Sequence, residues 1–404
     1  MRNRFKSTGA FNVTLFFLVL LTTLTAVTPK PQPDIPTSLK WSERMALSII
    51  KNNPEPWMIE FNKQPVWSYP QGLVLHAFEE MGKQNPKQQY QDYIKAYADV
   101  MIDEKGNIKT YDAASFNIDM VNSGKILFNL YEQTKDERYK TAIETLRHQM
   151  KWQPRTTDGG FWHKLRYPWQ MWLDGAYMAA PFLAQYGKTY GDKTAFDDVA
   201  TQLILLEKHT RDPKTGLLYH GWDESRFQQW ANPQTGTSPH FWGRAMGWYA
   251  MAIVDALDYF PQDHPKRKEI IGILQRLAPA LQKYQDPKTG LWYQVVDQGA
   301  REGNYLEASA SSMFVYALAK GANKGYIDKQ YRKVAEKGFK GIIDNMIEVK
   351  PDGEVLLHKV CAVAGLGGEP YRSGSYEYYV NELIRTNDPK GTGPFVLASL
   401  ELNK

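Results

Sequence analysis

The segment that decides the fold reads YPWQMWLDGAYMAAPF, from Tyr167 to Phe182. Its core, Met171 to Phe182, is apolar on nearly every side and carries one carboxylate, Asp174. A helix that is apolar all round is buried, and a lone acid at its start is costly unless it has partners or a task. Aromatic surroundings disfavour an ionised carboxyl group, so Asp174 is a candidate proton donor. The alternative is an acid that only stabilises the N-terminal end of its helix.

The composition indicates a large folded protein with an unusual supply of aromatic side chains. The chain has 404 residues, of which 43% are hydrophobic, and it contains 12 Trp and 24 Tyr. This is ample for one large core, and aromatic faces are also what carbohydrate clefts use. Cys361 is the only cysteine, so no internal disulfide can form.

The first 27 residues have the pattern of a secretory signal. Arg2, Arg4 and Lys6 form a basic start, and an uncharged apolar run follows. We expect residues 1–27 to be a signal peptide, residues 28–38 a proline-rich linker, and residues 39–404 a single catalytic domain of an exported, periplasmic or extracellular protein. An uncleaved membrane anchor is the alternative. Removing residues 1–27 takes away three positive charges and no acids, so the net charge falls from +5 to +2, which argues against a nucleic-acid partner.

Two kinds of helical segment alternate along the chain. The first kind is amphipathic, with apolar residues at helical spacing and a charged face. These segments are Trp41–Ile49, Tyr90–Met101, Tyr139–Met150, Phe196–Leu206, Ile270–Leu281 and Tyr331–Ile347. The second kind is richer in small and apolar residues. These segments are Tyr69–Met81, Ile118–Tyr131, Met171–Tyr186, Phe241–Tyr259, Ala308–Lys320 and Gly393–Leu402.

Six amphipathic and six apolar helices, repeated at roughly 50–80 residues, imply a closed ring, because no pair can bury its apolar face alone. The fold class is therefore predicted to be all-α, an (α/α)6 barrel with one central cavity. The turn sequence DPKTGL occurs at residues 212–217 and 286–291, and the flanking residues 217–219 and 291–293 suit short hairpin strands. Residues 376–385 do not fit the count, and we expect an extra helix there, near the mouth.

Loops that precede the inner helices would converge on one mouth of such a ring. The unusual polar and aromatic residues of the chain fall there, namely Tyr69, Asp119, His163, Lys164, His220, Trp242, Arg244 and Trp248. Asp119 and Asp174 in one cleft resist joint ionisation, which gives the acid and the base that glycosidic cleavage needs. The cationic side chains and the histidines suit a substrate that carries a carboxylate.

Each of these residues also has a structural interpretation as a helix cap, a hairpin hydrogen bond or core packing. Their convergence on one end of one cavity favours function. The sequence contains no HExxH, no cysteine pair, no calcium-loop ligand order and no phosphate loop, so we expect no metal site and no cofactor.

Two motifs resemble a known family. The sequence Trp162-His-Lys164 before YPWQMWLDG, together with FWGRAMGWY at Phe241–Tyr249, resembles the unsaturated rhamnogalacturonyl hydrolases of glycoside hydrolase family 105. The resemblance runs from about residue 40 to the end of the chain. It implies an (α/α)6 barrel and a substrate with a 4,5-unsaturated uronic acid at its non-reducing end, such as an unsaturated rhamnogalacturonan disaccharide released by a polysaccharide lyase.

The resemblance also implies roles for residues. It implies that Asp174 protonates C4 of the enol ether and activates water to attack C5, with Asp119 as the second acid. It further implies substrate contacts for Tyr69, His163, Lys164, His220, Trp242 and Arg244, with Trp248 as a further candidate.

Three alternatives stay open at this point. The first is a family 88-like unsaturated glucuronyl hydrolase that acts on glycosaminoglycan or ulvan fragments. The second is a conventional inverting glycosidase on the same toroid, and the third is a sugar-binding protein without turnover. The sequence leaves open the identity of the sugar and the oligomeric state.

Overall fold

Inner and outer helices alternate along residues 34–404, which are the residues that the computed structural model describes. The inner helices are α2 (Tyr69–Gln84), α4 (Lys125–Thr134), α6 (Leu173–Tyr190), α8 (Gly243–Ala256), α10 (Ala308–Asn323) and α13 (Pro389–Leu402). The outer helices are α1 (Trp41–Asn52), α3 (Gln88–Met101), α5 (Glu137–Trp152), α7 (Lys193–Thr210), α9 (Arg267–Lys283) and α11 (Gln330–Met346). The predicted signal peptide and most of the predicted linker lie outside the described residues.

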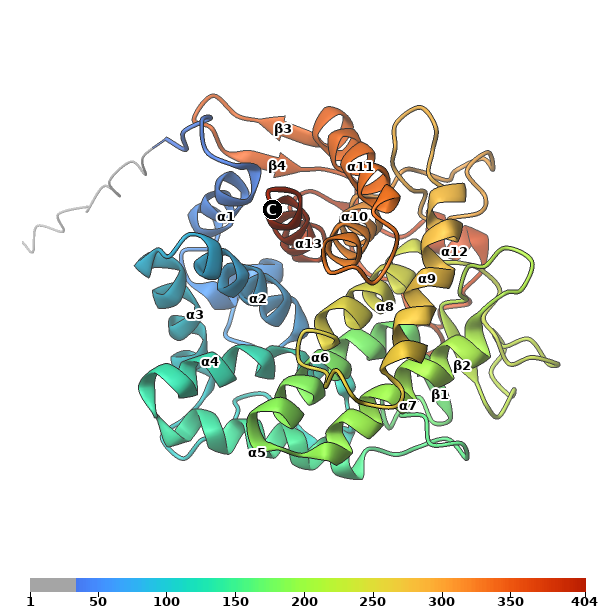
Figure 1. The fold of residues 1–404 in the computed structure, drawn as a ribbon, viewed down its shortest axis with the longest axis horizontal. Helices are drawn as coiled ribbons and strands as arrows, with labels where there is room; N and C mark the ends of the chain where they lie inside the picture. Colours follow the sequence, from blue (N-terminus) through green and yellow to red (C-terminus); the bar gives the residue numbers. More distant parts are fainter. Residues whose placement is uncertain (1–33) are drawn as a thin grey trace, which may run out of the picture. The chain divides into compact units, whose positions relative to one another are not determined.

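The inner helices close into a ring. Each packs against the next along the chain, and α13 packs against both α10 and α2, which joins the last inner helix to the first. Figure 1 shows α2, α6, α8, α10 and α13 toward the middle, with α1, α3, α5, α7, α9 and α11 around them. The predicted (α/α)6 barrel and all-α fold class are confirmed.

The two helix types differ in burial as their sequences predict. Every residue of α8 is buried, whereas α3 buries Tyr90, Tyr93 and Tyr97 on one face and exposes its charged residues on the other. Small residues allow the inner helices to approach closely. A Cβ on Gly72 would lie only 2.6 Å from Cα of Ser123, so only glycine permits this contact between α2 and the following segment.

The start of the second and third inner segments differs from the prediction. The second begins as a 3-10 helix, η3 (Ile118–Gly124), before α4 continues it. In the third, residues 171 and 172 belong to strand β1 (Gln170–Trp172), which pairs antiparallel with β2 (Gly221–Asp223). The helix begins at Leu173 instead, because the preceding backbone is extended and engaged in this pairing.

The predicted hairpin strands at residues 217–219 and 291–293 were wrong. Leu218 forms a single bridge with Arg211, and Tyr293 a single bridge with Leu306. Two small sheets lie elsewhere. They pair β3 (Ile347–Val349) with β4 (Val355–Leu357), and β5 (Val360–Cys361) with β6 (Ile384–Arg385).

The extra helix predicted over residues 376–385 is shorter than expected. Helix α12 spans Tyr376–Val380, and its continuation is lost because residues 384–385 pair with β5. Two further 3-10 turns lie in loops, η1 (Pro56–Phe61) and η2 (Ala113–Ser115). No helix within residues 34–404 is long and apolar enough to cross a membrane.

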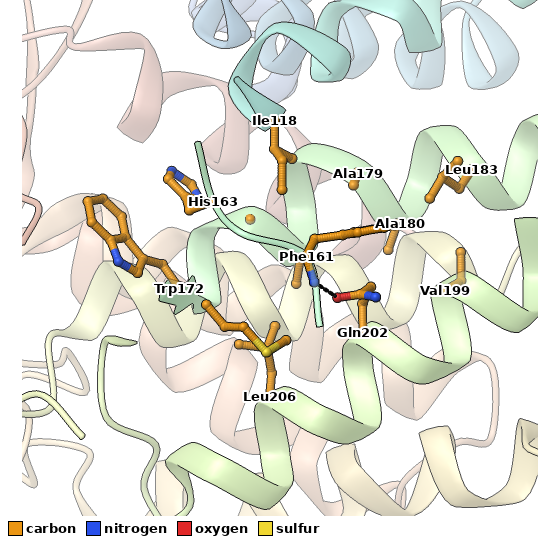
Figure 2. Close-up of a pocket in the computed structure, with 13 residues that line it drawn as sticks. Ile118, Phe161, His163, Trp172, Ala179, Ala180, Leu183, Val199, Gln202 and Leu206 are labelled. Atoms are coloured by element: carbon orange, nitrogen blue, oxygen red, sulfur yellow. Dashed lines mark hydrogen bonds between the residues drawn. The ribbon is translucent and has the colours of Figure 1, made fainter. Parts of the chain in front are cut away.

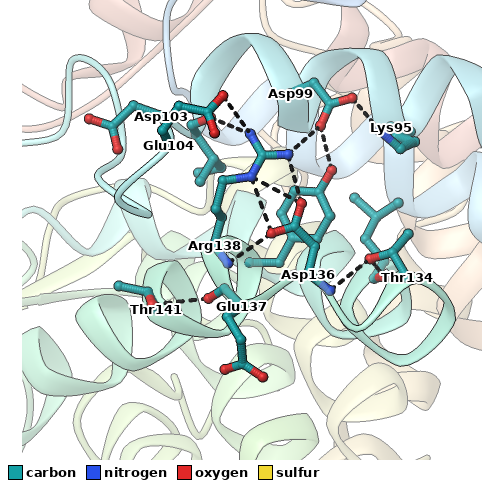
Figure 3. A network of polar contacts seen from close by, with 12 residues as sticks. Lys95, Asp99, Asp103, Glu104, Thr134, Asp136, Glu137, Arg138 and Thr141 are labelled. Atoms are coloured by element: carbon teal, nitrogen blue, oxygen red, sulfur yellow. Dashed lines mark hydrogen bonds and ion pairs between the residues drawn. The ribbon is translucent and has the colours of Figure 1, made fainter.

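A polar network joins two outer helices, as Figure 3 shows. Arg138 at the start of α5 pairs with Asp136 at 2.7 Å and reaches Asp99 of α3 at 3.4 Å. Asp136 also caps α5 by accepting a hydrogen bond from the Arg138 N–H at 3.0 Å. Since these groups are partly exposed, each ion pair contributes no more than about 1 kcal/mol. The network fixes the position of α3 against α5 on the outside of the ring.

Candidate active site

Asp174 lies in the first turn of α6, at the mouth of the ring. The pairing of β1 with β2 brings the segment before this helix against His220, whose carbonyl accepts the Leu173 N–H at 3.0 Å. As a result His220 Nε2 lies 3.1 Å from Asp174 Oδ2. The imidazole is fully buried, and the Asp174 side chain is 14% exposed. The distance is short enough for a hydrogen bond, although the two groups do not form one in this conformation.

The other ring nitrogen of His220 has a definite partner. Tyr379 Oη of helix α12 lies 2.8 Å from His220 Nδ1. Burial lowers the pKa of His220 although the nearby Asp174 opposes this, so the imidazole is neutral at neutral pH. Asp174 therefore faces an uncharged neighbour on this side.

Asp119 is held in a different way. It follows Asn117, whose side chain accepts the Asp119 N–H at 3.1 Å, and it sits in the first turn of η3. Its two oxygens contact Lys164 Nζ at 2.5 Å and His163 Nε2 at 3.3 Å. Burial by itself would raise the pKa of Asp119, but the Lys164 ammonium and the His163 imidazole outweigh it and hold the pKa well below its usual range. Asp119 is therefore a fixed carboxylate.

One indole ring connects the two acid–imidazole pairs. Trp172 stacks on His163 with ring centroids 4.5 Å apart, and its edge meets His220 at 5.6 Å. Tyr167 stacks on the same indole at 4.8 Å. Because aromatic stacking restrains both rings, Trp172 sets the spacing between the imidazoles that contact Asp119 and Asp174.

Tyr69 and Trp248 form a second aromatic wall. Tyr69 opens helix α2 and meets the fully buried Trp248 edge to face at 6.1 Å. Burial, with the nearby Glu60 carboxylate, raises the pKa of Tyr69 well above its usual value, so its hydroxyl remains protonated. Tyr69 is half-buried and can reach a ligand, whereas Trp248 supports it from behind.

Arg244 and Trp242 lie at the start of α8. Trp242 packs against His220 at 4.7 Å and donates its indole N–H to Gln294 at 3.1 Å. Arg244 is only 1% exposed, and its guanidinium donates to the carbonyls of Cys361 and Ala362. Two of its five N–H donors are thus occupied by backbone carbonyls at the end of β5 and a third by the Ser309 hydroxyl, so Arg244 has fewer free donors for a substrate than its sequence position suggests.

The structure thus brings the candidate residues into three groups around one mouth. His220 contacts Asp174 and packs against Trp242, His163 and Lys164 contact Asp119, and Tyr69 packs against Trp248. Two residues outside the predicted set join them. They are Tyr379, on His220, and Arg372, whose guanidinium donates to Tyr167 Oη at 2.5 Å and lies 5.6 Å from the Trp172 ring. In the sequence, the feature that could have indicated Tyr379 is the cluster of three tyrosines in YEYYV (376–380).

A small cavity lies behind these side chains, between α6, α7 and η3 (Figure 2). Its volume of about 20 Å³ can hold one water molecule and no sugar ring. Phe161 N–H donates to Gln202 of α7 at 2.7 Å along its wall, which anchors the loop that carries His163. Gly175 lies against the same histidine, since a Cβ there would be 3.0 Å from His163 Nδ1. The cavity is therefore a small packing void beside the site, and the residues of its wall hold His163 in place.

Comparisons with known proteins show the family to which this fold belongs. A family model described as Glycosyl Hydrolase Family 88 matches residues 41–404. The structure of a glycoside hydrolase from family 105 of C. acetobutylicum is 46% identical, with a TM-score of 0.86, and the match covers 90% of this chain and 99% of that one. Protein Atu3128 of Agrobacterium fabrum is 38% identical over 237 residues, 55% of this chain and 97% of that protein. Unsaturated rhamnogalacturonyl hydrolase YesR of Bacillus subtilis is 27% identical over 323 residues, 78% of this chain and 86% of that protein.

Proposed function

The chain belongs to the glycoside hydrolases of families 88 and 105, and we propose that it removes a 4,5-unsaturated uronic acid from the non-reducing end of oligosaccharides released by polysaccharide lyases. The first substrate to test is the unsaturated rhamnogalacturonan disaccharide, with unsaturated galacturonic acid as the ring removed, because the relative YesR is an unsaturated rhamnogalacturonyl hydrolase.

The observation that carries the proposal is the different environment of the two carboxyl groups. Asp119 is bound by Lys164 and His163, whereas among residues 34–404 the ion-pair partner of Asp174 is the neutral His220 alone, at 3.1 Å. A carboxyl group that gives a proton to the substrate must be able to hold that proton first. A permanently charged cation beside it would stabilise only the ionised carboxylate and so oppose protonation. Asp174 can hold its proton beside the neutral His220, and we assign it the role of proton donor.

The reaction then proceeds by hydration. Asp174 gives its proton to C4 of the enol ether, and the positive charge that develops is shared between C5 and the ring oxygen. The resulting carboxylate takes a proton from water as the water oxygen bonds to C5. The hemiketal opens by breaking the bond between C5 and the ring oxygen, and C1 then releases the second sugar as an alcohol. Asp174 ends in its initial protonated state, so one residue serves as acid and then as base.

The remaining residues bind and orient the substrate in this proposal. Tyr69 presents aromatic surface to the sugar ring, whereas Trp242 is 1% exposed and supports His220 from behind. Lys164 and Arg244 contribute positive charge near the carboxylate of the substrate. Asp119 keeps Lys164 and His163 in place.

The test measures the ultraviolet absorbance of the unsaturated bond, which hydration destroys. We expect this absorbance to disappear when the protein is added to a rhamnogalacturonan lyase digest. Digests made with glycosaminoglycan lyases and ulvan lyases serve as parallel substrates, and a faster reaction on one of them would reassign the sugar while keeping the reaction. Release of free sugar without loss of the absorbance would instead indicate a conventional glycosidase, and no reaction on any digest would refute the proposal.

We also propose that the protein is exported, on the basic start and apolar run of residues 1–27. Cell fractionation and N-terminal sequencing of the purified protein test this. A mature chain that begins near residue 28 is expected, and a protein that retains Met1 in the membrane fraction would favour the uncleaved anchor.

A further inference from the structure

Helix α12 places a tyrosine inside the site that none of the assigned roles uses. Tyr379 is fully buried although it lies on a helix of only five residues between β5 and β6. Its ring is nearly parallel to Trp242, with centroids 5.9 Å apart. Gln294 fixes both, because its amide donates to the Tyr379 carbonyl at 3.0 Å while its oxygen accepts from Trp242. The side chain is therefore held in one position, with its hydroxyl 2.8 Å from His220 Nδ1.

The protonation states of the neighbours determine the direction of this hydrogen bond. A neutral imidazole has one donor nitrogen and one acceptor nitrogen. His220 Nε2 faces the Asp174 carboxyl, and an ionised carboxylate only accepts hydrogen bonds. When Asp174 is ionised, Nε2 therefore carries the hydrogen, Nδ1 is the acceptor, and the Tyr379 hydroxyl donates. Burial raises the pKa of Tyr379 well above its usual value, so the hydroxyl keeps the proton that it donates.

We propose that Tyr379 is a positioning residue for the reaction, which holds His220 in the tautomer that directs its Nε2 hydrogen toward Asp174. The expected effect on the reaction rate rests on the proposed function, whereas the tautomer of His220 does not. After Asp174 has given its proton to C4, the neutral Nε2–H of His220 stabilises the Asp174 carboxylate. Because His220 carries no charge, Asp174 can still take a proton from water. The charged and titratable groups that face His220 are Asp174 of α6, Tyr379 of α12, and Arg372 and His163 from the loops.

The matched variants are Tyr379→Phe and Tyr376→Phe. Both remove one hydroxyl from α12, and both rings are buried. Tyr376 Oη donates to the carbonyls of Arg301 and Glu302, at 3.0 and 2.8 Å, and does not contact His220. A general weakening of α12 would affect both variants, whereas the loss of the bond to His220 affects only the first.

Kinetics on an unsaturated disaccharide give the first measurement. We expect Tyr379→Phe to lower kcat about tenfold, equivalent to about 1.4 kcal/mol, with KM changed by less than about twofold. Tyr376→Phe should keep kcat within about twofold of the wild type. Equal losses in the two variants, or an unchanged kcat in Tyr379→Phe, would overturn the proposal.

Nitrogen NMR of the protein labelled with [15N]histidine gives the second measurement. The His220 signals are identified by their loss in His220→Gln. In the wild type at a pH where Asp174 is ionised, we expect the Nε2–H tautomer, and in Tyr379→Phe a mixture of both tautomers. A wild-type Nδ1–H tautomer would overturn the proposal even if no Tyr379 variant folds. If the wild type acts on no unsaturated substrate, the proposed function fails, and this spectrum still decides whether Tyr379 positions His220.

Discussion

Replacing Asp174 with asparagine should separate catalysis from folding. The substitution keeps the shape of the side chain and removes its proton. In the part of the chain that the structure describes, Asp174 makes one close polar contact, to the neutral His220, and it lies in the first turn of α6. Even a fully ionised carboxylate at that position would contribute about 0.3–1 kcal/mol through the helix dipole, so the free energy of unfolding should fall by no more than about 1 kcal/mol.

The effect on the reaction should be much larger. General acid–base catalysis contributes about 10²–10⁴-fold, and in the proposed route the same carboxyl acts twice. We therefore expect kcat to fall by about 10³–10⁴-fold, which corresponds to roughly 4–5.5 kcal/mol of lost transition-state stabilisation. This loss exceeds the change in stability by several kcal/mol, so unfolding cannot account for it.

The assay follows the ultraviolet absorbance of the unsaturated disaccharide, and urea denaturation measures stability in parallel. Glu137→Gln is the control, because it removes an acid from the first turn of the outer helix α5. It should show a similar small change in stability and an unchanged kcat. Asp174→Asn with more than a tenth of the wild-type kcat would rule out Asp174 as the proton donor.

Four further outcomes follow from the site. Lys164→Met should lower the free energy of unfolding by about 1–3 kcal/mol, because it leaves Asp119 without its 2.5 Å partner, and adding Asp119→Asn should recover part of this loss in urea denaturation. The pKa of Asp119 is lower in the folded protein than in the unfolded chain, where it is about 3.9. The ionised Asp119 therefore contributes its full stabilisation above about pH 3.9, and this stabilisation is lost as the pH falls further. Asp119→Asn should therefore reduce the decline in the free energy of unfolding between neutral and acidic pH. Gly175→Ala should lower kcat by about 3- to 100-fold, because its Cβ would lie 3.0 Å from His163 Nδ1 and push the ring away from its position; an unchanged kcat would show that the position of His163 is not critical. Matched saturated and unsaturated disaccharides should differ in kcat/KM by at least about 10³-fold, since a saturated ring has no C4=C5 bond to protonate, and comparable rates would exclude the hydration route.

The helices of the barrel could be predicted from the sequence because their signal is local. The spacing of Tyr90, Tyr93 and Tyr97 marks one buried face, and the uninterrupted apolar character of residues 243–256 marks a helix buried all round. The prediction failed where tertiary pairing decides the structure. Met171 is extended because it pairs with Trp222 of β2, 51 residues later, and no pattern around Met171 records that contact.

The same distinction applies to the site. Asp119 and Asp174 were predictable because each is an isolated acid at the start of an apolar segment. The burial of Arg244 was not, because the carbonyls that occupy it come from residues 361 and 362, more than a hundred positions away. Tyr379 was missed for a similar reason. Its partner His220 lies 159 residues earlier, and a five-residue helix gives too short a pattern to show which face is buried.

The partners of the two acids, more than their number, distinguish the possible mechanisms. A conventional inverting glycosidase uses one carboxyl as acid and the other as base toward a water held between them. For Asp119 to take a proton from water, its contacts with Lys164 and His163 would have to weaken, and a hydrogen bond to a charged group is worth about 1.5–3 kcal/mol. Asp174 can gain and lose a proton beside the neutral His220 without breaking an ion pair. Hydration of a C4=C5 bond needs only one such group, because the proton given to C4 is replaced by the proton taken from water. The geometry of the pairs therefore favours hydration by Asp174 alone over a two-carboxyl displacement.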